Sequence, residues 1–267
     1  MGRRFVRGVL AGVTALAMVG LVGCGGDSKN STGSAPTTGA SSATGAATVF
    51  AAASLTESFT QIGKDFEAAN PGTKVTLNFA GSSALATQIN QGAPADVFAS
   101  AAPKNMQTVT DAGNAAGTPT TFAKNQLVIA VQEGNPKGIK TLADLAKPGV
   151  KVALCAEQVP CGAAAKAVLD TAGVKVTPVT YEQDVKAALS KVKLGEVDAA
   201  LVYRTDAKAA AADVDAVEFP ESSSAINNYP IVVLKNAPNK ATAQAFVDYV
   251  LSDKGKTVLT EAGFQAP

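Results

Sequence analysis

The chain has 267 residues, a formal net charge of +1 and no histidine. The missing imidazole removes the usual general base and the commonest metal ligand, so histidine-dependent hydrolysis and most zinc sites are excluded. Because the charge is balanced, the sequence offers no basic patch for a nucleic acid. This length is enough for one large domain or two small lobes.

The N-terminus predicts export and lipidation. Three arginines precede an apolar run at 9–23, which is the pattern of a secretory signal and is too short to span a bilayer comfortably. The sequence LVGC, which ends at Cys24, resembles the bacterial lipobox, in which the cysteine receives a lipid. We therefore expect a signal peptide at 1–23 and a lipid on Cys24. The alternative is an ordinary signal peptide that contains a cysteine.

A segment rich in Gly, Ser, Thr and Ala follows at 24–47. It has almost no large apolar side chain and cannot bury enough surface to offset its ordering entropy, so we expect a flexible tether. The body at 48–267 then holds 220 residues. Without the signal arginines, 20 basic residues face 22 acidic ones in the mature chain.

Strand-like and helix-like segments alternate along this body. Apolar residues recur with helical spacing at 55–70, whereas 125–132 is a continuous apolar run typical of a buried strand. The expected strands are 48–54, 74–80, 95–101, 125–132, 150–155, 175–180, 197–203 and 228–235. The expected helices are 55–70, 83–92, 103–113, 141–147, 161–173, 182–195, 204–213 and one or two within 241–263. This alternation predicts an α/β fold with mainly parallel sheets, which bind ligands where the helices begin.

Two cysteines remain besides Cys24, namely Cys155 and Cys161. Outside the cytoplasmic membrane a disulfide can persist, and a five-residue loop that turns at Pro160 can close one. We expect this disulfide; the alternative is two small buried thiols. Two thiols without an imidazole do not favour a metal site.

Four strand-to-helix junctions share small or hydroxylated residues and no charge at the turn. They are AAAS before Leu55, FAGSSAL at 79–85, QVPCGAAA at 158–165 and the turn before DVKAAL at 184–189. Free N–H groups at helix N-termini carry partial positive charge and bind anions, and serine adds a hydroxyl donor. Each junction also has a simpler interpretation, such as a capping box at 54–57 or a turn that serves only the disulfide.

The junctions together resemble a known family. In chain order, VFAAASLTESF, FAGSSALATQI, GAPADVFASA, VPCGAAAKAVL, EQDVKAAL and LVYRTDA are similar to the signature segments of the molybdate-binding proteins of bacterial ABC importers. The resemblance implies a two-lobed periplasmic-binding-protein fold of type II, which closes over a tetrahedral oxyanion. It implies that 125–132 and 229–235 cross between the lobes as a hinge. Lobe 1 would be 48–128 plus 235–267, and lobe 2 would be 129–234.

The resemblance also implies the ligands of the anion. The family's anion-binding positions correspond to Ser54, Ser82, Cys161, Val185 and Tyr203. The serines would give a hydroxyl and a backbone N–H, Cys161 and Val185 a backbone N–H, and Tyr203 its phenolic O–H. Such a set contains donors and no carboxylate, and no protein atom would bond the molybdenum. Two positions depart from better-known members: Cys161, commonly alanine, and Arg204, which we expect to face away from the anion.

The predicted function is therefore that of an extracytoplasmic lipoprotein, held at the cell membrane, that captures molybdate or tungstate for the permease and ATPase subunits of an ABC importer. We expect a monomer with no enzymatic activity, no cofactor and no nucleic-acid partner. A fully deprotonated dianion fits a site that contains only hydrogen-bond donors. Hydrogen phosphate would find no acceptor for its proton in such a site. The alternatives are a receptor for sulfate, phosphate or chelated iron, and an extracellular hydrolase, for which the chain lacks a G-x-S-x-G motif.

Overall fold

The structure, a computed structural model, describes residues 44–267. The expected signal peptide, Cys24 and most of the expected tether lie outside these residues. The described residues belong to one compact unit. None of the helices found in them is long and apolar enough to cross a membrane.

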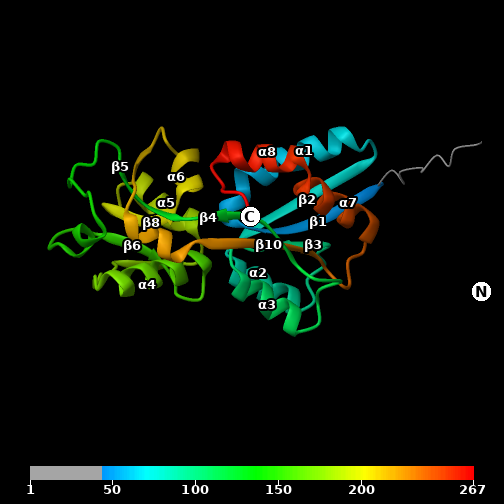
Figure 1. The fold of residues 1–267 in the computed structure, drawn as a ribbon, viewed down its shortest axis with the longest axis horizontal. Helices are drawn as coiled ribbons and strands as arrows, with labels where there is room; N and C mark the ends of the chain where they lie inside the picture. Colours follow the sequence, from blue (N-terminus) through cyan, green and yellow to red (C-terminus); the bar gives the residue numbers. More distant parts are fainter. Residues whose placement is uncertain (1–43) are drawn as a thin grey trace, which may run out of the picture. The chain divides into compact units, whose positions relative to one another are not determined.

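The first sheet has five strands in the order β2-β1-β3-β10-β4 (Figure 1). Its strands are β1 (Gly45–Ala52), β2 (Thr73–Ala80), β3 (Val97–Ala99), β4 (Thr120–Asn125) and β10 (Asn227–Val233). β1 pairs in parallel with β2 and β3, whereas β10 runs antiparallel to both β3 and β4. A single reversed strand therefore interrupts a parallel sheet.

Helices cover both faces of this sheet, because successive strand residues point to opposite sides. They are α1 (Thr56–Ala69), α2 (Ser82–Asn90), α3 (Pro103–Asp111), α7 (Lys240–Leu251) and α8 (Asp253–Ala262). Val49 and Ala51 pack with α1, α7 and α8, whereas Phe50, on the opposite side of β1, packs with α2 and α3 (Figure 1). The sheet and these helices form lobe 1.

The second sheet repeats this plan in the order β7-β6-β8-β5-β9. Its strands are β5 (Leu127–Gln132), β6 (Val152–Cys155), β7 (Thr180–Glu182), β8 (Ala199–Tyr203) and β9 (Val214–Val217). Here β5 is the reversed strand, antiparallel to β8 and β9, while β6 is parallel to β7 and β8. With α4 (Pro160–Ala172), α5 (Val185–Lys193), α6 (Arg204–Ala209) and the 3₁₀ helices η2 (Leu142–Ala146) and η3 (Pro220–Ala225), it forms lobe 2. The predicted α/β class with mainly parallel sheets is confirmed.

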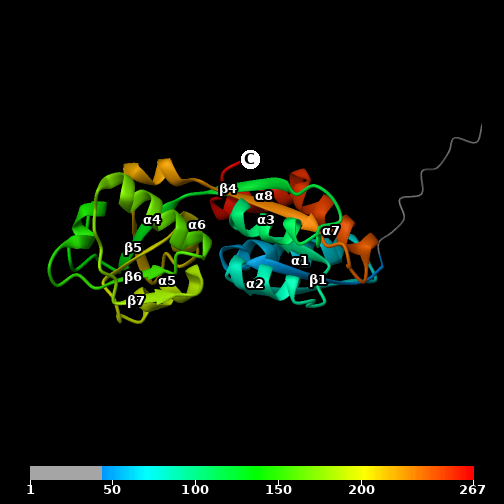
Figure 2. The same cartoon turned by 90° about the horizontal axis from the view of Figure 1, so that it is seen from below.

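The chain passes between the lobes twice, at Gln126 and at Ile226. β5 lies entirely in the second sheet and β10 entirely in the first, where β10 pairs with β4 beside the crossing (Figure 2). The expected lobe boundaries at 128/129 and 234/235 are thus two and eight residues too late. The apolar runs at 125–132 and 228–235 predicted buried strands correctly. The position of the crossing could not be predicted, because the chain crosses at a single residue outside the sheets and the residue composition there is not distinctive.

Several element boundaries also differ from the prediction. β1 begins at Gly45, inside the expected tether, because Gly45–Ala47 pair with Thr73–Val75 of β2. β7 begins at Thr180, after Pro178, because proline cannot donate to a sheet. Two strands, β4 and β9, were not predicted; both are edge strands of mixed composition. The segment 141–147, predicted as a helix, contains the 3₁₀ helix η2.

Candidate ligand-binding site

One cavity between the lobes is lined by all five residues that the resemblance selected: Ser54, Ser82, Cys161, Val185 and Tyr203. The other lining residues are Ala52, Ala53, Gly81, Ala101, Val159, Pro160 and Asp184. The cavity is small, with a volume of about 10 Å³, which is about the room that one water molecule needs. Most of the lining residues are Ala, Gly, Ser or Cys, whose small side chains let backbone amides approach a ligand.

The lobe 1 wall presents two serine hydroxyls that cap no helix. Ser54 lies in the 3₁₀ helix η1 (Ala53–Leu55), and the N-cap of α1 is Leu55 without a side-chain cap bond. Ser54 Oγ instead lies 2.9 Å from the hydroxyl of Tyr229, and Ser82 Oγ accepts from the N–H of Ala101 at 3.0 Å. The capping interpretation of Ser54 is therefore wrong. Because Ser82 Oγ only accepts in this bond, its O–H can donate to a ligand. The O–H of Ser54 can do the same when Tyr229 is the donor in the bond between them.

The lobe 2 wall presents two helix N-termini. Cys161 is in the first turn of α4, after Val159, which has no side-chain cap bond, and Val185 is the first residue of α5. Amides in the first turn of a helix have no partner within the helix. Both N–H groups are thus available to an anion, and the Val185 side chain need not contact it.

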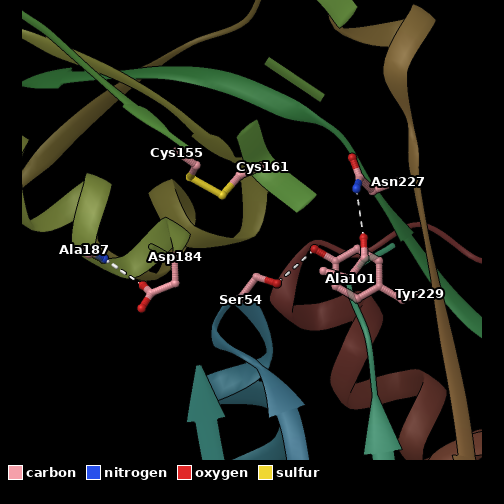
Figure 3. Close-up of a disulfide and its surroundings, with 8 residues drawn as sticks. All are labelled: Ser54, Ala101, Cys155, Cys161, Asp184, Ala187, Asn227 and Tyr229. Carbon is pink, nitrogen blue, oxygen red and sulfur yellow. Dashed lines mark hydrogen bonds between the residues drawn. A yellow bond between two sulfur atoms is a disulfide. The ribbon is translucent and has the colours of Figure 1, made fainter. Parts of the chain in front are cut away.

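A disulfide joins Cys155, at the end of β6, to Cys161 (Figure 3). The backbone is tightly packed here, because a Cβ added to Gly162 would lie 2.0 Å from the carbonyl oxygen of Ala156. The bridge and this packing both hold the first turn of α4 in place. The covalent link therefore fixes the amide that faces the cavity.

Tyr203 ends β8, and its side chain is only 1% exposed. Its hydroxyl has no hydrogen-bond partner within 44–267, although its ring packs against that of Tyr229 at 6.0 Å. Burial is the main cause that raises the pKa of Tyr203 well above its ordinary value, so the phenol keeps its proton. Leaving such a group unpaired costs about 1–3 kcal/mol, so this hydroxyl favours a ligand in the cavity that can accept a hydrogen bond from it.

No carboxylate was predicted at the site, yet Asp184 lines the cavity. Its Oδ1 accepts from the N–H of Ala187 at 2.9 Å, so the side chain caps α5 and points toward that helix (Figure 3). Arg204 is absent from the lining, as expected for a neighbour of Tyr203, and instead donates two hydrogen bonds of 2.7 Å to Glu218. No group of three or more His, Cys, Asp or Glu side chains that could hold a metal occurs within 44–267.

Asp206 is a fully buried carboxyl beside this site. It lies three residues after Tyr203 and forms an ion pair with Lys186 at 3.0 Å. Burial raises the pKa of Asp206 from its ordinary 3.8 to about 6, and Lys186 opposes this shift. Lys186 loses some basicity to burial, but Asp206 and Glu57 leave its pKa raised overall.

The raised pKa of Asp206 predicts a pH effect on stability. Between pH 4 and 6 the folded state binds more protons at this carboxyl than the unfolded state, so its stabilising contribution is complete below pH 4 and is lost as the pH rises to about 6. A shift of two pKa units corresponds to about 3 kcal/mol. Urea unfolding of the wild type and Asp206→Asn at pH 4–7 should show the wild type losing up to about this much relative to the variant. Parallel curves would contradict the shift.

Sequence reasoning missed Tyr229, Asp184 and Gly81. Tyr229 lies inside β10, which looked like a hinge strand, and only the pairing of β10 with β3 brings its hydroxyl to Ser54. Asp184 had a visible signal, because an aspartate directly before an apolar-periodic segment is a favoured N-cap. Gly81 was quoted within FAGSSAL but was given no role.

The comparisons assign the class of the protein. The model of the family described as "Bacterial extracellular solute-binding protein" matches residues 47–265. The chain therefore belongs to the bacterial extracellular solute-binding proteins. Members of this family bind solutes outside the cytoplasm and are not enzymes.

Individual relatives refine this assignment. The chain is 47% identical over 255 residues to the molybdate-binding protein ModA of Mycobacterium tuberculosis, covering 96% of each chain. Among solved structures, the periplasmic molybdate-binding protein of Azotobacter vinelandii has a TM-score of 0.73 at 23% identity, with 83% of this chain and 99% of that one covered. The sulfate-binding protein SubI of Mycobacterium tuberculosis has a TM-score of 0.70 at 19% identity, with 83% and 86% covered. Similarity of fold alone therefore does not identify which oxyanion is bound.

Proposed function

We propose that this protein is an extracytoplasmic receptor that binds molybdate in the cavity between its lobes. The observation that carries this proposal is the Tyr203 hydroxyl, which is buried in the cavity wall and has no hydrogen-bond partner among residues 44–267. A tetrahedral oxyanion in the cavity would accept from it. The ModA relative, 47% identical, supports molybdate as that anion.

The other lining groups suit the same ligand. The serine hydroxyls of lobe 1 and the first-turn amides of α4 and α5 in lobe 2 surround the cavity with neutral donors. Hydrogen bonds from such dipoles to an ionised oxygen are about twice as strong as neutral ones, and helix N-termini add partial positive charge. A dianion can therefore be held without a cation beside it.

The donor set also limits which anions fit. Hydrogen phosphate carries a proton that needs an acceptor, and Asp184, the one carboxylate among the lining residues, is turned toward α5, where it accepts from the N–H of Ala187. Tungstate matches molybdate in charge and shape, so we propose that it binds as well. Sulfate has the same charge but is smaller, so its hydrogen bonds to donors on opposite walls would be longer.

We further propose that a lipid on Cys24 holds the receptor at the outer face of the cell membrane, and that it delivers its anion to an ABC importer. The arginine-led apolar segment and the LVGC sequence support the anchor. Because both lobes contact the anion, binding favours the closed state, which the permease and ATPase subunits can distinguish from the open one.

A thermal-shift panel tests this proposal. A ligand at 1,000 times its Kd adds about 4 kcal/mol of stability, which corresponds to a rise in Tm of about 10 °C for a body of this size. We expect molybdate and tungstate to produce this rise at micromolar concentrations. Millimolar sulfate and phosphate should change the Tm little. Equal responses to sulfate and molybdate would refute the assignment of molybdate.

Tyr203→Phe is the matched variant for the same panel. It removes only the hydroxyl, and since that hydroxyl has no hydrogen-bond partner in the described part of the chain, the unliganded Tm should stay unchanged or rise. A hydrogen bond to a charged group contributes about 1.5–3 kcal/mol, so molybdate should bind about 10- to 100-fold more weakly. Undiminished binding by the variant would show that the anion does not reach Tyr203.

A further inference from the structure

Three charged side chains meet across the cleft beside the cavity. Lys186 Nζ lies 2.8 Å from each carboxylate oxygen of Glu57 and 3.0 Å from Oδ1 of Asp206. Glu57 is in α1 of lobe 1, whereas Lys186 and Asp206 are in α5 and α6 of lobe 2. Among the ion pairs formed within 44–267, Glu57–Lys186 is the one that joins the two lobes.

Each of these residues is close in sequence to a residue that lines the cavity. Lys186 directly follows Val185, Glu57 follows Ser54 by three residues, and Asp206 follows Tyr203 by three. Any movement that separates the Ser54 wall from the Val185 wall must therefore also separate Glu57 from Lys186. The ion pair can form only when the walls have come together.

We infer that Glu57 and Lys186 form a latch that stabilises the closed lobes and slows the release of the bound anion. Lys186 contacts Asp206 within its own lobe, so it remains paired when the lobes open. Glu57 loses its partner to solvent on opening, and the side chain is already 52% exposed when closed. The inference rests on the proposed binding of an anion in the cavity, but the latch itself does not touch the anion.

If Glu57 acted only through the electrostatic field of its charge, the effect of its removal on anion affinity would have the opposite sign. Glu57 is negative, and its carboxylate lies near the site proposed for a dianion, so removing its charge should strengthen binding if it acted only through repulsion. The latch predicts that the same change weakens binding. The sign of the effect therefore separates the two explanations.

The test compares wild type with Glu57→Gln, which removes the charge and keeps the size of the side chain. Calorimetric titration with molybdate at low salt should show Kd raised about 3- to 10-fold, and the difference should shrink in 0.5 M NaCl because surface charges are screened. Asp170→Asn is the matched control: it breaks the Lys166–Asp170 pair within α4 and removes one negative charge from lobe 2. Its Kd should equal that of the wild type.

Hydrogen exchange without ligand provides a second measurement that does not depend on the identity of the anion. Val185 is 3% exposed in the closed structure, so opening uncovers the first turn of α5. Glu57→Gln should exchange these amides several-fold faster than wild type and Asp170→Asn. Binding as tight as wild type, or unchanged exchange in Glu57→Gln, would overturn the latch. Failure of the wild type to bind molybdate would instead refute the proposed function, and the exchange comparison would still decide on the latch.

Discussion

Replacing Gly81 by alanine should weaken molybdate binding at least about 100-fold while the unliganded protein keeps its stability. Gly81 precedes α2 in lobe 1, and a Cβ built there would lie 2.3 Å from the carbonyl oxygen of Gln183, in lobe 2. Real Cβ atoms do not approach a backbone oxygen so closely, so the lobes could not reach the closed arrangement. Since tenfold in affinity corresponds to about 1.4 kcal/mol, a loss of about 3 kcal/mol of closure energy is sufficient.

The clash depends on closure and not on the fold of lobe 1. Gly81 has φ −59° and ψ 134°, a conformation that alanine adopts freely. Alanine is a poorer N-cap than glycine, but it also loses less chain entropy on folding, and the two effects are of similar size. We therefore expect the Tm without ligand to change by only a few degrees.

Gly63→Ala is the control for this experiment. Gly63 is inside α1 of the same lobe, and its added Cβ would meet nothing closer than Leu77 Cδ1 at 3.5 Å, an ordinary contact. This variant should bind molybdate like the wild type and unfold at an equal or higher temperature, because alanine favours a helix. Calorimetric titration and thermal unfolding of both variants provide the comparison. Normal affinity in Gly81→Ala would mean that the anion binds without the closure seen here.

Local patterns in the sequence predicted the elements that depend on local chemistry. The helical spacing at 55–70 buries Phe59 and Phe66, and the apolar run at 125–132 contains β5, buried from Leu127 to Val131. The small residues at the junctions were also informative, because they mark the places where the backbone of each lobe approaches the cavity. The resemblance then selected five residues, from four separate junctions and the end of a strand, and all five line one cavity.

What the sequence could not show depends on contacts between distant segments. The Ser54 hydroxyl meets Tyr229, 175 residues away, and Lys186 meets Glu57, 129 residues away. Neither pair has a sequence pattern, because each exists only through the order of the strands and the closure of the lobes. The role of Gly81 is of the same kind: its missing Cβ matters only because Gln183 lies opposite.

Ser82→Asp should abolish molybdate binding, and the effect should be electrostatic. Ser82 is 1% exposed, lines the cavity and is the first residue of α2. A carboxylate there would face the bound dianion. Two like unit charges 4 Å apart repel by about 4 kcal/mol at an effective dielectric constant of 20, which alone lowers affinity about 1,000-fold, and a dianion doubles the repulsion.

Lobe 1 should nevertheless fold with this substitution. Ser82 Oγ accepts from the N–H of Ala101, and a carboxylate oxygen can accept the same bond. The first turn of a helix also favours a negative side chain. When the lobes are open the new carboxylate is hydrated, so the unliganded Tm should stay within a few degrees of the wild-type value.

Ser83→Asp separates position from charge. Ser83 is the next residue of α2, is partly exposed and does not line the cavity, so an aspartate there adds the same charge and remains hydrated. We expect its Kd for molybdate, measured by calorimetric titration, to rise at most a few-fold, against complete loss in Ser82→Asp. If both variants lost binding equally, the net charge of lobe 1 would control affinity. If Ser82→Asp still bound, the anion would lie elsewhere, because a buried carboxylate and an unprotonated dianion cannot share the donors of one cavity of this size.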